Sequence, residues 1–118
     1  MSGQRWSLEQ STAWAEKVGW LVGCNFTPST AGNQLEMWQP ETFDAETIDR
    51  ELGWAAGLGM NAVRVYLHDL LYASDSIGFL NRIDQVLEIA DSHKIGMIPV
   101  LFDGVWNTHP QLGPQPEP

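Results

Sequence analysis

The sequence has 118 residues, of which 43% are apolar, and this composition predicts one compact domain and excludes a disordered chain. Fifteen Asp and Glu residues against six Lys and Arg residues give a net charge of −9, which argues against nucleic acid and anionic membrane surfaces as partners. The single cysteine, Cys24, excludes an intramolecular disulfide and a cysteine-based zinc site within this chain.

The first residues, MSGQRWSLEQST, carry no apolar segment of the secretory kind after Arg5. No apolar run in the sequence approaches the roughly 20 residues of a membrane-spanning helix. We therefore expect a cytoplasmic protein without a membrane partner.

Two elements are predicted in the first quarter of the chain. Ser7 and Gln10 have the spacing of a capping box, which predicts a helix over residues 8–19. The continuous apolar run over residues 20–26 predicts a buried strand, because it is too short for an independent helix. The apolar side of the helix consists of Leu8, Ala15 and Val18.

A second helix and strand follow. Asp44 is placed as an N-cap, and Gly57 and Gly59 are typical of a helix C-terminus. Residues 61–67, NAVRVYL, are rich in β-branched and aromatic side chains and predict the second strand. The buried stripe of this helix is expected to be Ile48, Leu52, Ala55 and Ala56.

The same order occurs a third time. Asp75 or Ser76 is placed to cap a helix, and residues 96–102, GMIPVLF, predict a third strand. Pro99 weakens that strand prediction, since proline cannot donate to a sheet and prefers edges or bulges. The apolar stripe of the third helix is expected to be Leu80, Ile83, Leu87 and Ala90.

Three strands that alternate with helices, with centres about 35 to 40 residues apart, are the pattern of parallel βαβ units with right-handed crossovers. The predicted fold class is therefore α/β. In parallel α/β folds the functional residues lie on the segments that follow the carboxyl ends of the strands.

The segment after the first strand, residues 27–43, is long for a connection of this kind. One interpretation is a binding loop that presents Asn33, Gln34, Glu36 and Trp38. The other interpretation is an ordinary surface loop in which Met37 and Trp38 fill a local gap.

The second strand places Ala62, Arg64 and Tyr66 on one side and three apolar residues on the other. A guanidinium on a sheet needs carboxylate partners, which a structural Asp or Glu or a functional site could supply. We favour the functional interpretation, because His68 and Asp69 come at the carboxyl end of the same strand.

The third strand is followed by Asp103 and Trp106. A carboxylate beside an indole suits a sugar, whose hydroxyl groups bond to oxygen and whose C–H face stacks on an aromatic ring. Asp103 could equally cap a turn. The sequence contains no glycine-rich phosphate loop, HExxH or GxSxG motif, which argues against nucleotide chemistry and zinc proteolysis.

The segments GCNF, NQLEMW, LGMNAVRV and RVYLHDL, with IGMIPVLFDGVW further on, resemble the opening of a clan A glycoside hydrolase barrel. The resemblance is to cellulase-like, family-five-like (β/α)8 enzymes, in particular bacterial 1,4-beta-xylanases, and it spans nearly the whole chain. It implies a retaining hydrolase of β-linked plant polysaccharide or oligosaccharide, cellulose, xylan or mannan being examples, that needs no cofactor or metal.

In a retaining mechanism one carboxylic acid protonates the leaving oxygen and a carboxylate about 5 Å away attacks the sugar. In this clan both are Glu residues on the fourth and seventh strands, so the resemblance implies that neither catalytic residue is in this chain. It assigns to Arg64 the role of orienting the nucleophile. The candidates for contact with the sugar are His68, Asp69, Asp103, Trp106, Asn25, Glu36 and Trp38.

A (β/α)8 barrel needs about 250 residues, so residues 1–118 would be an N-terminal fragment with about three of the eight units, and the rest of the barrel would be its partner. Three units alone leave two unpaired edges and an open inner face, so we expect an isolated chain that is marginally stable or prone to aggregation. A sharp cooperative melt of a soluble monomer would contradict this.

Two other classes stay open. The first is a noncatalytic carbohydrate-binding or interaction protein on a partial barrel, with Trp38 and Trp106 as stacking platforms. The second is a small acidic signalling domain of flavodoxin-like form, which has five strands where this sequence predicts three.

Overall fold

The structure, a computed structural model, describes residues 3–104 and 107–117. Its sheet has three parallel strands in the order β1-β2-β3, so β2 pairs with both of the others. The predicted α/β class is therefore confirmed for the described part of the chain. The elements in chain order are α1 (Leu8–Val18), β1 (Gly23–Asn25), α2 (Gln34–Trp38), α3 (Ala45–Gly57), β2 (Ala62–Tyr66), α4 (Asp69–Ser74), α5 (Ser76–Ser92) and β3 (Gly96–Val100).

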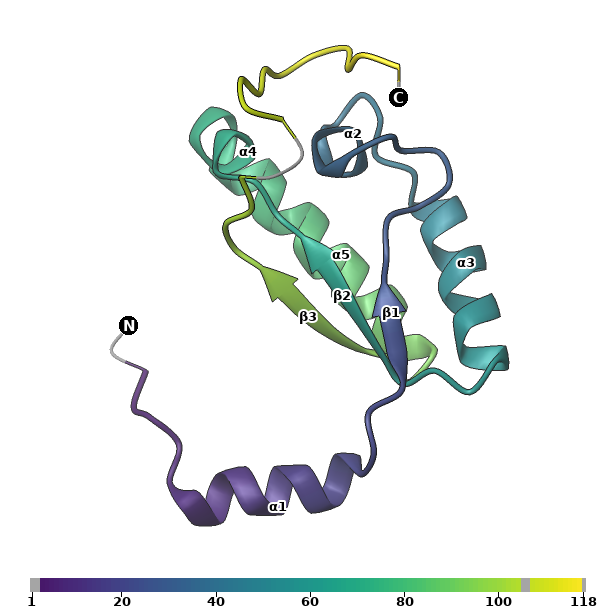
Figure 1. Ribbon diagram of the computed structural model, residues 1–118, viewed down its shortest axis with the longest axis vertical. Helices are drawn as coiled ribbons and strands as arrows, with labels where there is room; N and C mark the ends of the chain where they lie inside the picture. The colour runs from purple at the N-terminus through teal and green to yellow at the C-terminus, as the bar shows by residue number, and fades with distance from the viewer. Residues whose placement is uncertain (1–2, 105–106, 118) are drawn as a thin grey trace.

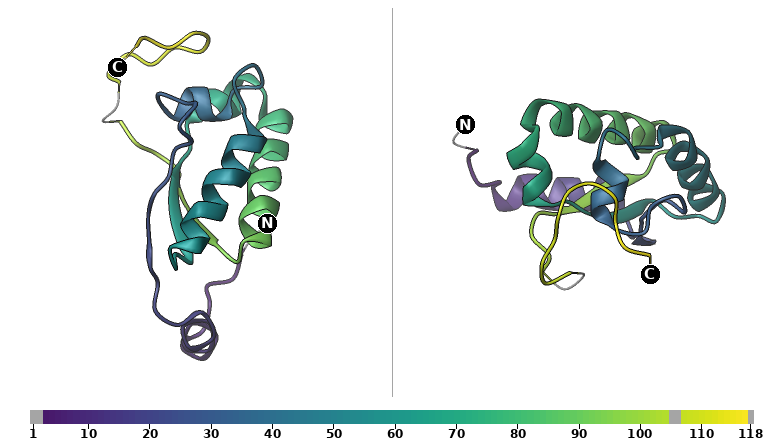
Figure 2. Two further views of the ribbon diagram at one scale, coloured as in Figure 1. Left: turned by 90° about the vertical axis from the view of Figure 1, so that its right-hand side faces the viewer. Right: turned by 90° about the horizontal axis from the view of Figure 1, so that it is seen from above.

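The helices are distributed unevenly around the sheet. Figures 1 and 2 show α3 and α5 side by side on one face, whereas no helix of the described chain covers the other face. The short helices α2 and α4 lie at the carboxyl ends of the strands, and α1 projects from the opposite end. The domain is thus a two-layer arrangement with one open sheet face.

The core lies between the sheet and the two long helices. Val63 and Val65 point toward the helices and are 2% and 0% exposed, and Ile48 and Leu52 of α3 meet them without any exposed surface. Strand alternation turns Arg64, between the two valines, to the open face. The core is completed by Phe26, Leu35, Met37, Trp38, Leu67, Leu71, Phe79, Val86, Ala90 and Ile95.

The predicted helix starts are confirmed, because they depend on local hydrogen bonds. In the capping box of α1 the Ser7 amide donates to Gln10 Oε1 at 2.8 Å, and the Gln10 amide donates to Ser7 Oγ at 3.2 Å. Asp44 caps α3 and accepts hydrogen bonds from the hydroxyl and the amide of Thr47. These bonds hold the pKa of Asp44 below its usual range, so this stabilisation of α3 is lost as the pH falls through that lowered pKa.

The first strand is shorter and more exposed than predicted. Only three residues form β1 and all are exposed, because β1 lies at an edge of the described sheet and one of its faces is uncovered. The residues just before β1 bond to the start of β2 and to the Asn61 side chain, and the Val22 carbonyl accepts the backbone amides of Asn61 and Ala62 at 2.8 and 3.2 Å. Asn61 Nδ2 donates to the Trp20 carbonyl at 2.8 Å, and the Val22 amide donates to Asn61 Oδ1 at 2.7 Å.

The predicted apolar stripe of α5 was wrong in two positions. Leu80 and Leu87 are 48% and 41% exposed, whereas Phe79 and Val86 are 3% and 1% exposed. At each of these two positions the sequence has two consecutive apolar residues. The helical periodicity is therefore compatible with either of two neighbouring helix faces being buried. Packing against the sheet selects the face with Phe79, Val86 and Ala90.

The strand β3 forms in spite of its proline. Pro99 lies opposite Val65 in the parallel ladder. Within the described chain β3 has a neighbour on one side only, and proline is tolerated on an edge strand because no second neighbour requires its missing N–H.

Candidate functional site at the carboxyl ends of the strands

The segments that follow the three strands gather at one end of the sheet. Helix α2 follows β1 and α4 follows β2. The C-terminal segment, residues 107–117, comes after β3 in the chain and crosses above them (Figure 1). This is the end at which parallel α/β proteins bind ligands. Two hollows of about 220 and 720 Å³ lie there.

The smaller hollow brings together three of the predicted site residues. His68, Asp69 and Asp103 line it, beside the exposed ring of Phe102. His68 and Asp103 also share a narrow hollow with Asn33. Histidine and two carboxylates at one surface offer both donors and acceptors, which suits a ligand that carries hydroxyl groups.

His68 also has a structural role, and the proton on its ring depends on which of two contacts its Nδ1 atom makes. Its Nδ1 atom accepts the Leu70 amide at 3.1 Å as the N-cap of α4, so the neutral ring carries its proton on Nε2. The same Nδ1 lies 3.1 Å from Asp69 Oδ1. These two contacts exclude each other, because Nδ1 must be protonated to donate to Asp69 and unprotonated to accept from Leu70. The side chain of His68 is 10% exposed and that of Asp69 is 72% exposed.

Arg64 lies on the open sheet face and is held there by two neighbours. Its Nε donates to Asn25 Oδ1 on β1, and its Nη2 donates to the Tyr66 hydroxyl, both at 2.8 Å. These bonds use two of the five N–H donors of a guanidinium. Within residues 3–104 and 107–117 Arg64 forms no ion pair, so the structural carboxylate that one interpretation required is not found there. Asn25 is thereby placed beside Arg64.

Trp38 does not lie where a sugar could reach it. Its side chain is 0% exposed, it contacts the rings of Phe43 and Phe79, and its Nε1 donates to the Tyr66 carbonyl at 2.9 Å. Met37 is 1% exposed as well, so these two residues fill the core, as the alternative interpretation of residues 27–43 held. The proposed role of Trp38 as a stacking platform is corrected accordingly.

The other two candidates are separated from this group. Glu36 lines the larger hollow, where its Oε2 accepts the Gly32 amide at 2.9 Å. Trp106 lies outside the described residues. The structure therefore groups His68, Asp69 and Asp103 at one hollow and Arg64 with Asn25 on the open face.

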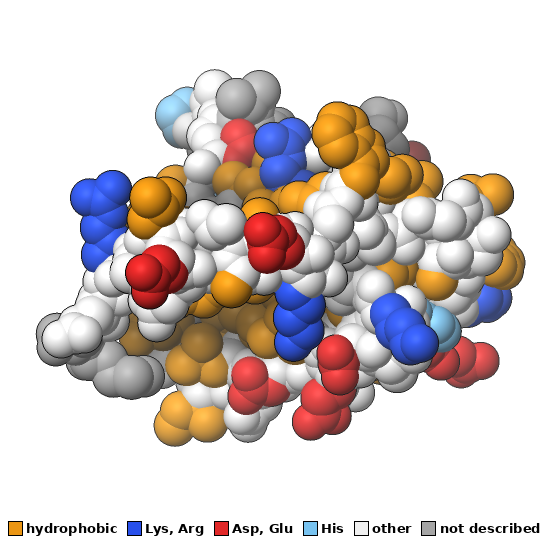
Figure 3. Space-filling model, turned by 90° about the horizontal axis from the view of Figure 1, so that it is seen from below, with side chains coloured by type: hydrophobic (Ala, Val, Ile, Leu, Met, Phe, Trp, Pro, Cys, Tyr) orange, Lys and Arg blue, Asp and Glu red, His pale blue; other side chains and the backbone are white. Residues whose placement is uncertain are grey.

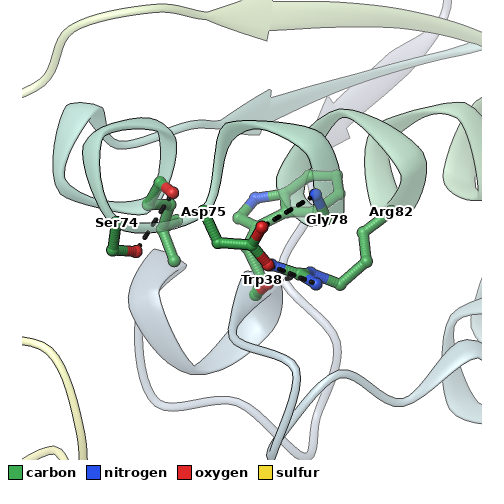
Figure 4. Close-up of polar contacts among 6 residues, drawn as sticks. Trp38, Ser74, Asp75, Gly78 and Arg82 are labelled. Atoms are coloured by element: carbon green, nitrogen blue, oxygen red, sulfur yellow. Dashed lines mark hydrogen bonds and ion pairs between the residues drawn. The ribbon is translucent and has the colours of Figure 1, made fainter.

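Sequence reasoning missed the residue that organises the larger hollow. Arg82, on α5, is 12% exposed in its side chain, and its Nε donates to the Trp38 carbonyl at the end of α2 at 2.5 Å (Figure 4). Its Nη1 is 3.9 Å from Asp75 Oδ2, while Asp75 Oδ1 accepts the Gly78 amide at 3.1 Å. Arg82 and Trp38 are 44 residues apart, and no local pattern in the sequence indicates their contact.

Replacing Arg82 with methionine is expected to lower the free energy of unfolding by about 1.5–3 kcal/mol, because a charged donor to a part-buried carbonyl is lost. The ion pair between Arg82 and Asp75 adds little to the stability, since its N–O distance is long and the Asp75 side chain is half exposed. Urea unfolding followed by circular dichroism measures the loss. Arg5→Met, at an exposed position, is the control, and equal midpoints for the two variants would contradict this role of Arg82.

The C-terminal segment is held over α2 by side-chain amides. Gln39 accepts the Gly113 amide through Oε1 at 2.7 Å and donates through Nε2 to the Gly113 carbonyl at 3.1 Å. Asn33 Nδ2 donates to Gln115 Oε1 at 2.9 Å. Leu112, Gly113 and Gln115 thereby become one wall of the larger hollow.

Comparisons with known proteins found no match among protein-family models, curated proteins or solved structures. Within residues 3–104 and 107–117 no helix is long and apolar enough to cross a membrane. In the same residues no group of three or more His, Cys, Asp or Glu side chains is placed to hold a metal ion.

Proposed function

We propose that this chain is the N-terminal part of a retaining glycoside hydrolase that cleaves β-linked plant polysaccharide or oligosaccharide. It would supply the first three units of a (β/α)8 barrel. The observation that carries the proposal is Arg64, a guanidinium fixed by Asn25 and Tyr66 on an open sheet face and without an ion pair in the described chain. A carboxylate that approaches this face would find donors already in position.

The sheet topology supports the same proposal. The strands are parallel and adjacent in chain order, β1-β2-β3, which is the order that successive βα units take in a barrel. The residues that follow β2 and β3 meet at a hollow at the carboxyl end, where barrel enzymes carry their sites. The 118 residues amount to less than half of the roughly 250 that a complete barrel uses.

In the proposed enzyme both catalytic carboxylates come from later strands. Arg64 would donate hydrogen bonds to the nucleophile, keep it ionised and fix its direction of attack on the sugar. His68, Asp69 and Asp103 would bond to sugar hydroxyl groups at the rim. Arg64 would act as a positioning residue, because it would touch the nucleophile and not the reacting sugar carbon.

The test uses the longest reading frame that contains these 118 residues. Its product is expected to hydrolyse an aryl β-xyloside, β-glucoside or β-mannoside, and Arg64→Met is expected to lower kcat on the order of 10²-fold with little change in KM. Arg64→Lys should recover only part of the loss, since an ammonium lacks the planar fork. Arg50→Met, on the exposed surface of α3, should retain full activity.

Three outcomes would overturn the proposal: no hydrolysis by the longer product, full activity in Arg64→Met, or hydrolysis by the 118-residue chain alone. Oligosaccharide binding without hydrolysis would favour the noncatalytic carbohydrate-binding class. That class loses one of its two platforms, because Trp38 is buried in the core.

A further inference from the structure

The N-cap of α4 is His68, at a position that favours serine, threonine, asparagine or aspartate. The side-chain oxygens of those four residue types accept an N–H bond at any pH near neutrality. In His68 the acceptor is a ring nitrogen instead, because Nδ1 accepts the Leu70 amide at 3.1 Å. A ring nitrogen that binds a proton can no longer accept, and histidine is the side chain that ordinarily changes its charge near neutral pH. The cap of α4 therefore depends on an atom that can be protonated.

A second partner for the same nitrogen lies equally close. Asp69 Oδ1 is 3.1 Å from His68 Nδ1. The Leu70 amide can only donate and an ionised Asp69 can only accept, so an unprotonated Nδ1 bonds to Leu70 and a protonated Nδ1 bonds to Asp69. Both partners are already within hydrogen-bond distance, so the exchange requires no large movement of either residue.

The charged side chains that face His68 are both carboxylates. Asp69 faces it from the start of α4, and Asp103 faces it from the segment after β3, where both hollows are lined by His68 and Asp103. Residues 33–35, which line the narrow hollow from the side of α2, carry no titratable group, and neither do the two residues of the C-terminal segment that line it. Lys and Arg side chains are seen on the face below the amino ends of the strands, at the opposite end of the sheet (Figure 3). Among the described residues that line these hollows, a protonated ring would meet carboxylates and no cation.

We propose that His68 is a proton-controlled switch at the start of α4. When Nδ1 is unprotonated, the ring caps the helix through the Leu70 amide. When Nδ1 takes up a proton from water, the ring pairs with Asp69 and the Leu70 amide loses its acceptor. Since His68 and Asp69 line the smaller hollow, the switch changes one wall of that hollow together with the first turn of α4. It does not depend on the proposed hydrolase activity, because every contact lies within this chain.

Nuclear magnetic resonance of the nitrogen-15-labelled chain, between about pH 8 and pH 5, tests the proposal. At the alkaline end of this range the ring nitrogens of His68 are expected to show a proton on Nε2 and none on Nδ1. As the pH falls, the Leu70 amide resonance should shift with the same midpoint as the His68 ring. Exchange of that amide with solvent, corrected for the intrinsic effect of pH, should accelerate about fivefold as the cap is lost.

Two asparagine variants separate the switch from other titrations. His68→Asn keeps an oxygen acceptor at the N-cap but cannot bind the proton, so the Leu70 resonance should stay constant over the same pH range. His93→Asn is the matched control, because His93 Nε2 also contacts a carboxylate, Asp49 Oδ1, at 2.7 Å, but lies at the C-terminal end of α5. This variant should leave the pH response of Leu70 unchanged.

Asp69→Asn tests the second contact of the ring. A neutral amide replaces the carboxylate that accepts from the protonated ring, so the midpoint of the Leu70 response should move to lower pH. An unchanged midpoint would overturn the exchange of partners. The proposal would also be overturned by a neutral His68 ring with its proton on Nδ1, by a Leu70 amide that does not follow the ring, or by a response that persists in His68→Asn.

Discussion

Replacing Trp38 with alanine is expected to lower the free energy of unfolding by about 3–5 kcal/mol. The side chain is fully buried between Phe43 and Phe79, and its indole N–H bonds to the Tyr66 carbonyl at 2.9 Å. The substitution leaves a cavity where α2 meets β2 and α5, and it leaves that carbonyl without its donor. Equilibrium unfolding in urea, monitored by circular dichroism, measures the effect.

Two variants separate packing from hydrogen bonding. Trp38→Phe keeps most of the apolar volume but removes the donor, so it should cost less than the alanine variant. Trp54→Ala makes the same replacement at a site that is 61% exposed and should change stability by no more than about 0.5 kcal/mol. If Trp38→Ala were as stable as Trp54→Ala, the core position of Trp38 would be wrong.

Replacing Gly23 with alanine is the second substitution with a large expected effect, a loss of about 3 kcal/mol. A Cβ atom on Gly23 would overlap the carbonyl oxygen of Ala62, the residue opposite it in the ladder. The obstacle is backbone of the central strand, which cannot turn aside as a flexible side chain can. The expected result is an edge strand β1 displaced from β2.

Gly57→Ala is the matched control, because nothing lies within 4 Å of a Cβ placed there. Gly57 is the last residue of α3, where alanine favours the helix, so this variant should be neutral or slightly stabilising. Urea unfolding compares the two substitutions directly. Similar unfolding midpoints would show that β1 does not approach β2 as closely as described.

Much of this fold could be predicted from the sequence, because its signals are local. Ser7, Asp44 and Asp75 cap the helices as expected, since each depends on a hydrogen bond to a residue three positions away. The alternation of helices with three apolar runs indicated a parallel sheet before any contact was known.

The features that sequence reasoning missed depend on distant partners. Both Phe79 and its neighbour Leu80 could face a core, and only the position of the sheet selects Phe79. An indole ring such as that of Trp38 could have served as a binding residue had it been exposed. Trp38 is buried instead, because α2 packs between elements that are far away in sequence. The sequence around Arg82 does not indicate its role, since its hydrogen-bond partner is the backbone carbonyl of the distant residue Trp38.

The positions of the candidate site residues could be predicted only where they follow directly from the position of a strand end. Because parallel strands bring their carboxyl ends to one edge, residues just after β2 and β3 had to lie near each other, and His68 and Asp103 do share a hollow. Glu36 belongs to the long segment after β1, where α2 redirects the chain. Its place at the other hollow could not be read from spacing.

The register of the sheet also has a consequence for the order in which the chain folds. Asn25 of β1 lies beside Arg64 of β2, 39 residues later in the chain, and β2 is the strand to which both others pair. During synthesis β1 therefore has no strand to pair with until α3 and β2 have left the ribosome. The backbone hydrogen bonds of α3 are local, so this helix can begin to form earlier, whereas sheet formation must wait for β2 and for the closure of long loops.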